Sequence, residues 1–166
     1  EEVIGQVADA SGEDMLAAIG AARRAFDTTD WSTDGEFRKR CLYQLKEAIE
    51  SELEDLRAEL VAEVGCPVLI TYGPQLDAPL REALTWPADM IEHFEWEREL
   101  PPKDAFGMGV ESRRAVWKEP MGGVGVITPW NLPVEINLNK RGPVHAKGNT
   151  CELKPAPHTP INPTRR

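Results

Sequence analysis

The sequence predicts an α/β fold in which helices come first, a β-hairpin follows, and one parallel βαβ unit closes the chain. Three observations predict this class. Apolar residues recur at helical spacing up to about residue 97, and Pro101-Pro102 then interrupts the pattern. Strand, helix and strand signals follow one another between residues 124 and 154, which is the spacing of a parallel βαβ unit. We therefore divide the chain into 1–105, 106–120 and 121–166.

The first two helices are predicted from their caps and their apolar stripes. Residues 11–26 begin at Ser11, a good N-cap, with Asp14 three residues later. A longer helical stretch, 34–64, ends at Gly65. Both stretches carry apolar residues at helical spacing, namely Met15, Ile19, Ala22 and Phe26 in the first and Phe37, Cys41, Leu45, Ile49, Leu53, Leu56 and Leu60 in the second.

Two breaks are expected within the helical part. The spacing of the apolar residues slips between Ile49 and Leu56, which favours two helices there. Residues 75–97 also have a helical pattern, with Pro79 in the first turn and Pro87 at a kink or a split. The inward side of this segment is predicted to carry Leu76, Leu80, Ala83, Met90, Ile91 and Phe94.

The hairpin and the βαβ unit follow the proline pair. Residues 106–118 contain β-forming residues around the polar segment 111–114, so we place the turn of the hairpin there. Residues 124–127 are short and apolar enough for a buried strand, and 134–146 form a helix. Gly148-Asn149 ends that helix, and the second strand covers 150–154.

Charge and composition exclude some classes of function. A net charge of −9 and a pI near 4.9 argue against a general nucleic-acid binder, which needs a basic surface. Residues 138–166 nevertheless hold six basic residues against one acid. This local excess of positive charge would suit an anionic ligand, and the alternative is that the basic stretch arose by chance. We expect no membrane partner, because apolar runs are short. The acidic start is not a secretory signal and lacks an initiator Met, so the chain is expected to begin inside a longer product.

Common catalytic motifs are missing from the sequence. It contains no G-x-G-x-x-G fingerprint, no Walker loop, no H-E-x-x-H and no G-x-S-x-G. The three histidines are scattered and are interpreted as structural or solvated. Cys41, Cys66 and Cys151 show neither pairing nor metal-ligand spacing, which fits a reduced, cytoplasmic compartment.

The segment Thr128–Pro133 is the strongest candidate for a site. It follows one predicted strand and opens a helix, where open α/β sheets place their ligand crevices. Lys154 ends the second strand and therefore meets the same edge of the sheet. The amide of Asn131 could bind an oxyanion there, and Lys154 a polar cofactor group. The alternative is that the turn is purely structural.

A resemblance to a known family supports the site interpretation. The runs that carry it are Trp117-Lys118-Glu119-Pro120, Gly123-Val124-Gly125-Val126-Ile127-Thr128-Pro129-Trp130-Asn131, Gly142-Pro143, Gly148-Asn149-Thr150 and Leu153-Lys154-Pro155-Ala156. In these runs the chain closely resembles the NAD(P)-dependent aldehyde dehydrogenase superfamily. P-W-N followed by K-P-A is highly specific, and the resemblance covers about the first third of a typical member. It implies an incomplete, Rossmann-like cofactor domain.

The resemblance also implies roles for individual residues. Asn131 would stabilise the oxyanion formed when a thiolate attacks an aldehyde. The groove for NAD or NADP would be lined by Ile127, Thr128, Pro129 and Trp130. Lys154 would reach the adenosine ribose, with Pro155, Ala156 and Pro157 beside it. Residues 106–119 would build an oligomerisation surface for a homo-oligomer. A complete member would oxidise a small aldehyde to a carboxylic acid.

The same resemblance implies that this chain alone is inactive. The catalytic cysteine, the general-base glutamate and the glycine-rich loop of the family all lie beyond Arg166, and no cysteine here matches the nucleophile's motif. Pro157 stands where many NAD-preferring members have Glu, which leaves NAD and NADP both open. Two alternatives to part of an enzyme are a non-catalytic remnant that acts as an interaction module and a weak nucleotide-binding domain. We expect the isolated chain to be poorly soluble or to oligomerise, because its strands have unpaired edges.

Polar residues stand at positions where the family is usually apolar. Arg141 and His145 are one turn apart in the predicted helix, so they share a face. Glu152 interrupts an aliphatic strand, and burying it without a partner would cost several kcal/mol. We interpret these residues as relaxed selection on a truncated or decaying copy. The alternative is a compensating polar cluster of Arg141, His145, Lys147 and Glu152.

Overall fold

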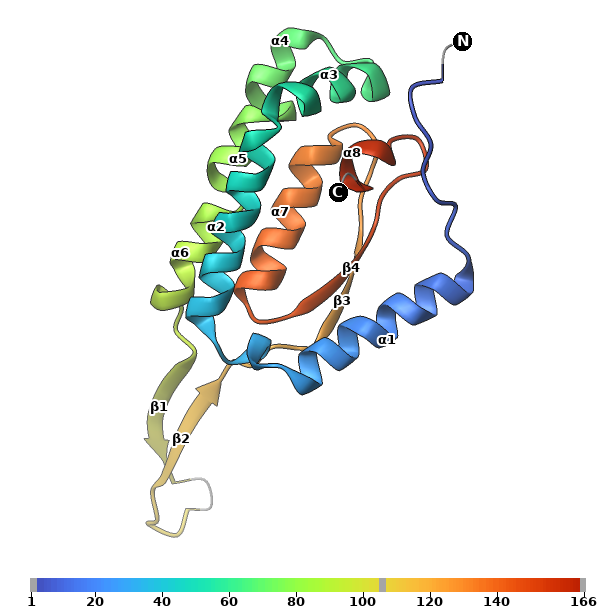
Figure 1. The fold of residues 1–166 in the computed structure, drawn as a ribbon. Helices are drawn as coiled ribbons and strands as arrows, with labels where there is room; N and C mark the ends of the chain where they lie inside the picture. Colours follow the sequence, from blue (N-terminus) through green and yellow to red (C-terminus); the bar gives the residue numbers. More distant parts are fainter. Residues whose placement is uncertain (1–2, 105–106, 165–166) are drawn as a thin grey trace.

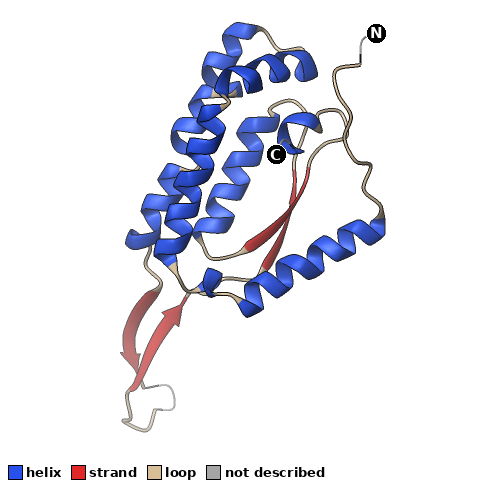
Figure 2. Cartoon of the chain, viewed as in Figure 1, coloured by secondary structure: helices blue, strands red, loops and turns tan. Residues whose placement is uncertain are grey.

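The computed structural model describes residues 3–104 and 107–164, in which helices predominate over two small sheets (Figure 2). One sheet is the parallel pair β3 (Gly123–Ile127) and β4 (Thr150–Lys154), joined by the helix α7 (Pro133–Ala146). The other is the antiparallel hairpin of β1 (Glu97–Lys103) and β2 (Ser112–Trp117). The predicted α/β class and its closing βαβ unit are therefore confirmed.

Helices lie on both faces of the parallel pair. The helix α1 (Gly12–Thr28) contacts one face of β3 and β4, and α7 contacts the other (Figure 1). The predicted capping box is present, since Asp14 N donates to Ser11 Oγ over 3.2 Å and the Asp14 carboxylate accepts from Ser11 N. The apolar stripe of α1 is only partly buried. None of its residues is fully buried, and Ile19 is 47% exposed, because the small sheet covers only part of the helix.

The predicted stretch 34–64 divides where its apolar spacing slips. It forms α2 (Gly35–Ser51) and α3 (Leu53–Val64), which meet at Glu52. Gly65 ends α3 with φ +71°, a left-handed conformation that glycine adopts without a steric penalty. The predicted end of the helical stretch at Gly65 and its predicted division into two helices are both confirmed.

Shorter elements connect α3 to the hairpin. They are α4 (Val68–Ile70), the π-type turn η2 (Thr71–Gln75), α5 (Asp77–Glu82) and α6 (Thr85–His93), while η1 (Asp30–Ser32) links α1 to α2 and α8 (Ile161–Thr164) follows β4. Pro79 lies in the first turn of α5, as predicted. The split falls at Ala83 and Leu84 and not at Pro87, because Pro87 occupies the first turn of α6, where its missing N–H has no helical partner to lose.

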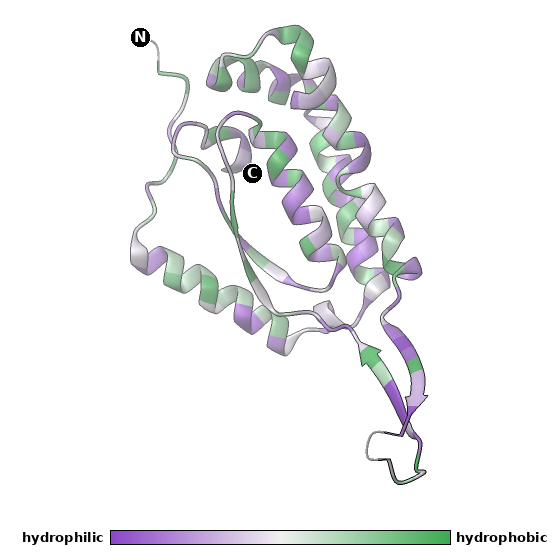
Figure 3. Ribbon diagram, turned by 180° about the vertical axis from the view of Figure 1, so that it is seen from behind, coloured by the Kyte–Doolittle hydropathy of each residue, from purple (hydrophilic) through white to green (hydrophobic). Residues whose placement is uncertain are grey.

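The predicted position of the hairpin is wrong. The segment 111–114, taken as the turn, lies almost entirely in β2, and the first strand comes before Asp104 and includes Pro101-Pro102. The two prolines are tolerated because β1 is an edge strand and its pairing with β2 is irregular between Leu100 and Lys103. Ala105 and Phe106, at the start of the predicted hairpin, lie outside the described residues. The hairpin projects away from the rest of the chain, and hydrophilic colours interrupted by short hydrophobic bands run along it (Figure 3).

The hydrophobic core lies between helices and not on the sheet. It packs α2, α3, α5, α6 and α7 together through Leu42, Leu56, Leu60, Leu76, Leu80, Ala83, Leu84, Ala88, Ile91, Val134, Leu138 and Ala146. In β3 only Val126 is buried, and Ile127 is 78% exposed. The expectation of a buried strand at 124–127 is therefore wrong, since two strands with one helix on each face leave their edges open.

Gly142 allows α7 to approach the end of α5 closely. A Cβ at this position would lie 2.1 Å from the backbone oxygen of Ala83, well inside contact distance. We predict that Gly142→Ala lowers the free energy of unfolding by about 1–3 kcal/mol, although alanine is the better helix former. Chemical denaturation measures this loss. The matched control is Gly20→Ala in α1, whose Cβ would meet only the end of the Arg24 side chain; it should stabilise by up to about 1 kcal/mol. Equal effects at the two glycines would contradict the prediction.

Candidate functional site

The predicted site residues lie at the carboxyl edge of the parallel pair. Ile127 stands opposite Lys154 in the register of β3 and β4, and Thr128 N donates to Lys154 O over 3.3 Å. Because parallel strands end at the same edge, the loop after β3 and the loop after β4 start side by side. The structure therefore brings together the two motifs that the sequence analysis singled out.

The loop after β3 presents an apolar surface to solvent. Trp130 is 54% exposed, and Pro129 is exposed as well. Thr128 is buried, and its Oγ1 has no hydrogen-bond partner within the described part of the chain. Ile127, Pro129 and Trp130 thus expose apolar surface beside the buried Thr128, an arrangement that suits a flat ligand.

Asn131 is exposed, and its backbone is held from a distant helical segment. Gln75, which ends η2 and is only 6% exposed, donates from Nε2 to Asn131 O over 2.9 Å. This bond fixes the loop just before α7 begins and leaves the Asn131 side chain at the surface. Sequence reasoning missed Gln75, because the partners are 56 residues apart and no motif connects them.

The loop after β4 keeps Lys154 accessible. The Lys154 side chain is exposed, and its Nζ donates to Pro155 O over 3.3 Å. A turn follows, in which Thr159 N donates to Ala156 O over 3.2 Å and Thr159 is almost completely buried. Pro157 lies exposed within this turn. The turn anchors the loop at Thr159 and leaves the lysine ammonium at the open edge.

The thiols of Cys66 and Cys151 are not activated for attack. Burial raises the pKa of the Cys66 thiol and that of the Cys151 thiol, which lowers the thiolate population of both at neutral pH. Cys151 lies three residues before Lys154 in β4, and so about 10 Å along the strand from the carboxyl edge. Cys41, Cys66 and Cys151 are all partly buried, as is common for cysteines without a catalytic role.

The polar residues of α7 make contact with β4. Cys151 Sγ lies 3.5 Å from His145 Nε2, and the Arg141 side chain also hydrogen-bonds Cys151. Burial and the nearby Arg141 charge lower the pKa of His145 to about 4, so its imidazole is neutral at pH 7. Arg141 and His145 thus share a face, as predicted.

Lys147 and Glu152, the other two members of the alternative polar cluster, lie elsewhere. Lys147 packs its ammonium on the ring of Phe94, and burial with the nearby Lys118 charge lowers its pKa to about 8. Glu152 occupies the opposite face of β4 from Cys151, because side chains alternate along a strand. Its Oε1 is buried without a partner within residues 3–104 and 107–164. The cluster that forms is therefore Arg141, His145 and Cys151, and the alternative of a four-residue polar cluster is wrong.

The described residues hold no metal-binding group and no membrane-spanning helix. No group of three or more His, Cys, Asp or Glu side chains is placed to hold a metal ion in that part of the chain. None of its helices is both long and apolar enough to cross a membrane.

Comparisons with known proteins identify the family. Residues 1–165 match the sequence model of the aldehyde dehydrogenase family. The chain is 32% identical to aminoacetaldehyde dehydrogenase from Pseudomonas aeruginosa, with 99% of this chain and 32% of that protein covered. It is 33% identical to betaine aldehyde dehydrogenase from Bacillus subtilis, with 97% of this chain and 31% of that protein covered. The chain thus spans about a third of the length of these curated relatives.

Solved structures agree in fold with this chain. A crystal structure of indole-3-acetaldehyde dehydrogenase in the apo form superposes with a TM-score of 0.86 at 27% identity, covering 99% of this chain and 36% of that chain. A Mycobacterium tuberculosis aldehyde dehydrogenase complexed with NAD+ superposes with a TM-score of 0.80 at 28% identity, covering 93% of this chain and 30% of that chain. These neighbours share the Rossmann-like arrangement of the βαβ unit. Taken with the family match over residues 1–165, they show that this chain belongs to the aldehyde dehydrogenase family.

Proposed function

We propose that this chain supplies one side of the cofactor groove and the oxyanion donor of an NAD(P)-dependent aldehyde dehydrogenase, which oxidises a small aldehyde to a carboxylic acid. The observation that carries the proposal is the pairing of Ile127 with Lys154 at the open carboxyl edge. An exposed apolar side chain and an exposed cation stand there next to each other, where open α/β sheets bind dinucleotides.

The residues at this edge fit the adenosine part of NAD or NADP. The Lys154 ammonium can donate to ribose hydroxyls or to a 2′-phosphate, which is why both cofactors suit it. Ile127, Pro129 and Trp130 offer apolar surface to the flat parts of the cofactor, and the Thr128 hydroxyl is without a partner within the described residues. Pro155, Ala156 and Pro157, which follow Lys154 in the loop, would line the groove beside it.

Asn131 is proposed as the group that acts on the substrate. Its side-chain N–H can donate to the aldehyde oxygen while negative charge develops there, which lowers the barrier to attack. The Gln75 bond to its backbone holds the loop in place for this task. When bound, the nicotinamide would supply the hydride acceptor for the oxidation.

The chain by itself is proposed to be catalytically inactive. Burial keeps Cys66 and Cys151 largely protonated at neutral pH, and Cys151 lies well back from the carboxyl edge. The nucleophile of the proposed reaction is then a residue other than Cys66 and Cys151. Three free cysteines among the described residues suit a reducing, cytoplasmic compartment.

Association with a second copy is proposed to involve the hairpin. Trp117 at the end of β2 is 68% exposed, and Met108 and Val110 in the connecting loop are more exposed still. Large apolar side chains on a projecting hairpin are costly in water, so contact between copies would remove them from solvent.

Titration with nucleotides tests the proposal. We expect saturable binding of NAD+, NADP+ or ADP-ribose to the 166-residue chain by calorimetry. Lys154→Met should weaken the binding by roughly ten- to a hundredfold, because a hydrogen bond from a charged donor contributes about 1.5–3 kcal/mol. Lys140→Met, which removes an exposed lysine from α7, is the matched control and should bind as the parent does. Absence of saturable heat with all three nucleotides, or equal losses in the two variants, would contradict the proposal.

A further inference from the structure

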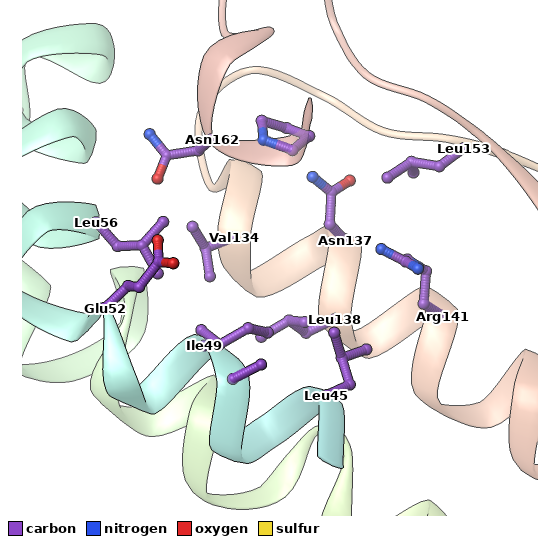
Figure 4. Close-up of a pocket in the computed structure, with 12 residues that line it drawn as sticks. Leu45, Ile49, Glu52, Leu56, Val134, Asn137, Leu138, Arg141, Leu153 and Asn162 are labelled. Carbon is purple, nitrogen blue, oxygen red and sulfur yellow. The ribbon is translucent and has the colours of Figure 1, made fainter. Parts of the chain in front are cut away.

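A cavity lies against α7, and none of the carboxyl-edge residues 127–131 and 154–157 lines it. Its volume is about 250 Å³, somewhat below the roughly 300–1,000 Å³ of pockets for drug-sized ligands. It opens between α2, α7, β4 and α8 (Figure 4). Most of the lining is aliphatic, contributed by Leu45, Ala48, Ile49, Leu56, Val134, Leu138, Leu153 and Pro163. The cavity therefore suits a compact ligand with a hydrocarbon part.

Polar groups at one end of the cavity have no partner in the described part of the chain. Asn137 is only 5% exposed, and its Oδ1 accepts no hydrogen bond from any described residue. Arg141 Nε is buried and has no acceptor among the same residues. Figure 4 shows both side chains rising from the same side of α7 toward α8 and Leu153. Unsatisfied buried polar groups are costly, so a ligand that accepts from the Arg141 Nε–H gains more than the bond itself.

The rim of the cavity is held in a defined position. Asn162 on α8 is buried, and its Nδ2 donates to Glu63 Oε2 over 2.9 Å, which ties α8 to α3. Asn162 N donates to the same carboxylate oxygen over 3.3 Å. Asn162 Oδ1 is left without a partner within the described residues, like Asn137 Oδ1. Two side-chain amides, the Arg141 guanidinium and the Glu52 carboxylate are thus the polar groups that line the cavity.

The charge at the polar end decides the chemistry of the ligand. Arg141 forms no ion pair with a described carboxylate, and its contact on β4 is the neutral thiol of Cys151. A half-buried guanidinium without a counter-ion favours an anion, and a carboxylate can accept from its Nε–H. Rotation of the Asn137 amide by 180° would add its N–H as a second donor.

We propose that this cavity binds an aliphatic monocarboxylate, with its carboxylate on Arg141 and Asn137 and its hydrocarbon chain along Leu45, Ile49 and Leu138. The site uses neither the carboxyl-edge residues nor a dinucleotide, so it stands independently of the proposed catalytic role. Leu153 belongs to β4, and ligand bound beside it would also contact the strand that carries Lys154.

Octanoate is the probe for this site. We expect saturable one-to-one binding to the 166-residue chain by calorimetry, with propanoate at least tenfold weaker because each buried methylene contributes about 0.8 kcal/mol. Octan-1-ol should also bind at least about tenfold more weakly, since it lacks the charge that Arg141 bonds. Equal affinities of octanoate and octanol would overturn the assignment of an anion site.

Variants in α7 test which residues bind the carboxylate of octanoate. Arg141→Met should weaken octanoate binding by at least about tenfold, and Arg141→Lys should restore part of it by keeping the charge. Asn137→Leu should weaken it as well, while Lys140→Met on the exposed side of α7 should not. Binding that is unaffected by Arg141→Met would sink the proposal, even if NAD+ binding at the carboxyl edge is found.

The imidazole of His145 provides a second readout. Arg141 is one cause of the low pKa of His145, so a carboxylate bound to Arg141 should raise that pKa. NMR titration of His145 with and without octanoate measures the change, and Arg141→Met should abolish the response to octanoate. A different result would contradict the proposal. Octanoate would not bind, light scattering would show a dimer, and hydrogen exchange would show that Leu138 and Leu153 are protected in it. The cavity would then be covered by a second copy of the chain.

Discussion

Replacement of Arg57 by methionine is expected to lower the free energy of unfolding by about 3–5 kcal/mol, the usual cost of removing one partner from a buried ion pair. Arg57 is 5% exposed and extends from α3 to two other elements. Its guanidinium donates to Asp77 Oδ1 of α5 over 2.8 Å and to Thr71 Oγ1 of η2 over 3.0 Å. It also lies 4.0 Å from the ring centre of Tyr72. Methionine fills similar space but leaves the Asp77 carboxylate without its partner.

Denaturation in urea tests the role of Arg57 against a surface pair. Arg23→Met removes the exposed pair of Arg23 with Asp27 in α1 and should cost less than about 1 kcal/mol. Asp77→Asn in the Arg57→Met background should recover part of the loss, because it removes the unpaired charge. A loss at Arg57 no greater than that at Arg23 would refute the prediction.

The same substitution bears on the candidate site. Gln75 belongs to η2, whose Thr71 is held by Arg57, and Gln75 in turn holds the backbone of Asn131. Loosening η2 should therefore also reduce the order of the loop that carries Asn131. This chain of contacts links a buried arginine in α3 to the loop that precedes α7.

The second large effect is a loss of stability on acidification. The pKa of His145 is about 4 in the folded protein, against 6.5 for an unburied imidazole. Between these values the unfolded chain binds a proton at this position and the folded chain does not. The contribution of His145 to the free energy of unfolding is thus fully present above pH 6.5. It is lost as the pH falls toward 4, which lowers the free energy of unfolding by up to about 3 kcal/mol.

Comparison of variants isolates the contribution of His145. His145→Leu removes the titrating group, so its free energy of unfolding should depend less steeply on pH between 6.5 and 4.5 than that of the parent. The matched control is His158→Gln, which changes an exposed residue in the loop after β4 and leaves His145 buried. Unfolding by urea at several pH values measures all three slopes. Parallel slopes for His145→Leu and the parent would contradict the prediction.

Local signals in the sequence predicted the elements whose boundaries depend on neighbouring residues. The Ser11–Asp14 capping box, the left-handed Gly65 and the spacing of the βαβ unit each involve a few consecutive residues, so they could be recognised without a structure. The hairpin could not be placed in this way. Pro101-Pro102 normally argues against a strand, and only the irregular pairing with β2 makes it acceptable.

The carboxyl edge combines both kinds of information. The P-W-N and K-P-A runs predicted that Asn131 and Lys154 would meet at one edge, because parallel strands leave no other arrangement. The Gln75 bond to Asn131 lies outside any local pattern, since the partners are far apart in the chain. It could be found only after η2 was placed against α7.

The sequence by itself determined the family, the βαβ unit and the residues of the candidate site, because each depends on short motifs and their order. The tertiary structure decided what lies buried. It placed the core between the helices, separated Lys147 and Glu152 from Arg141, and left the Asn137 and Arg141 side chains facing a cavity. Burial depends on which surfaces of distant segments meet, and periodicity along one segment reports only which of its own residues share a face.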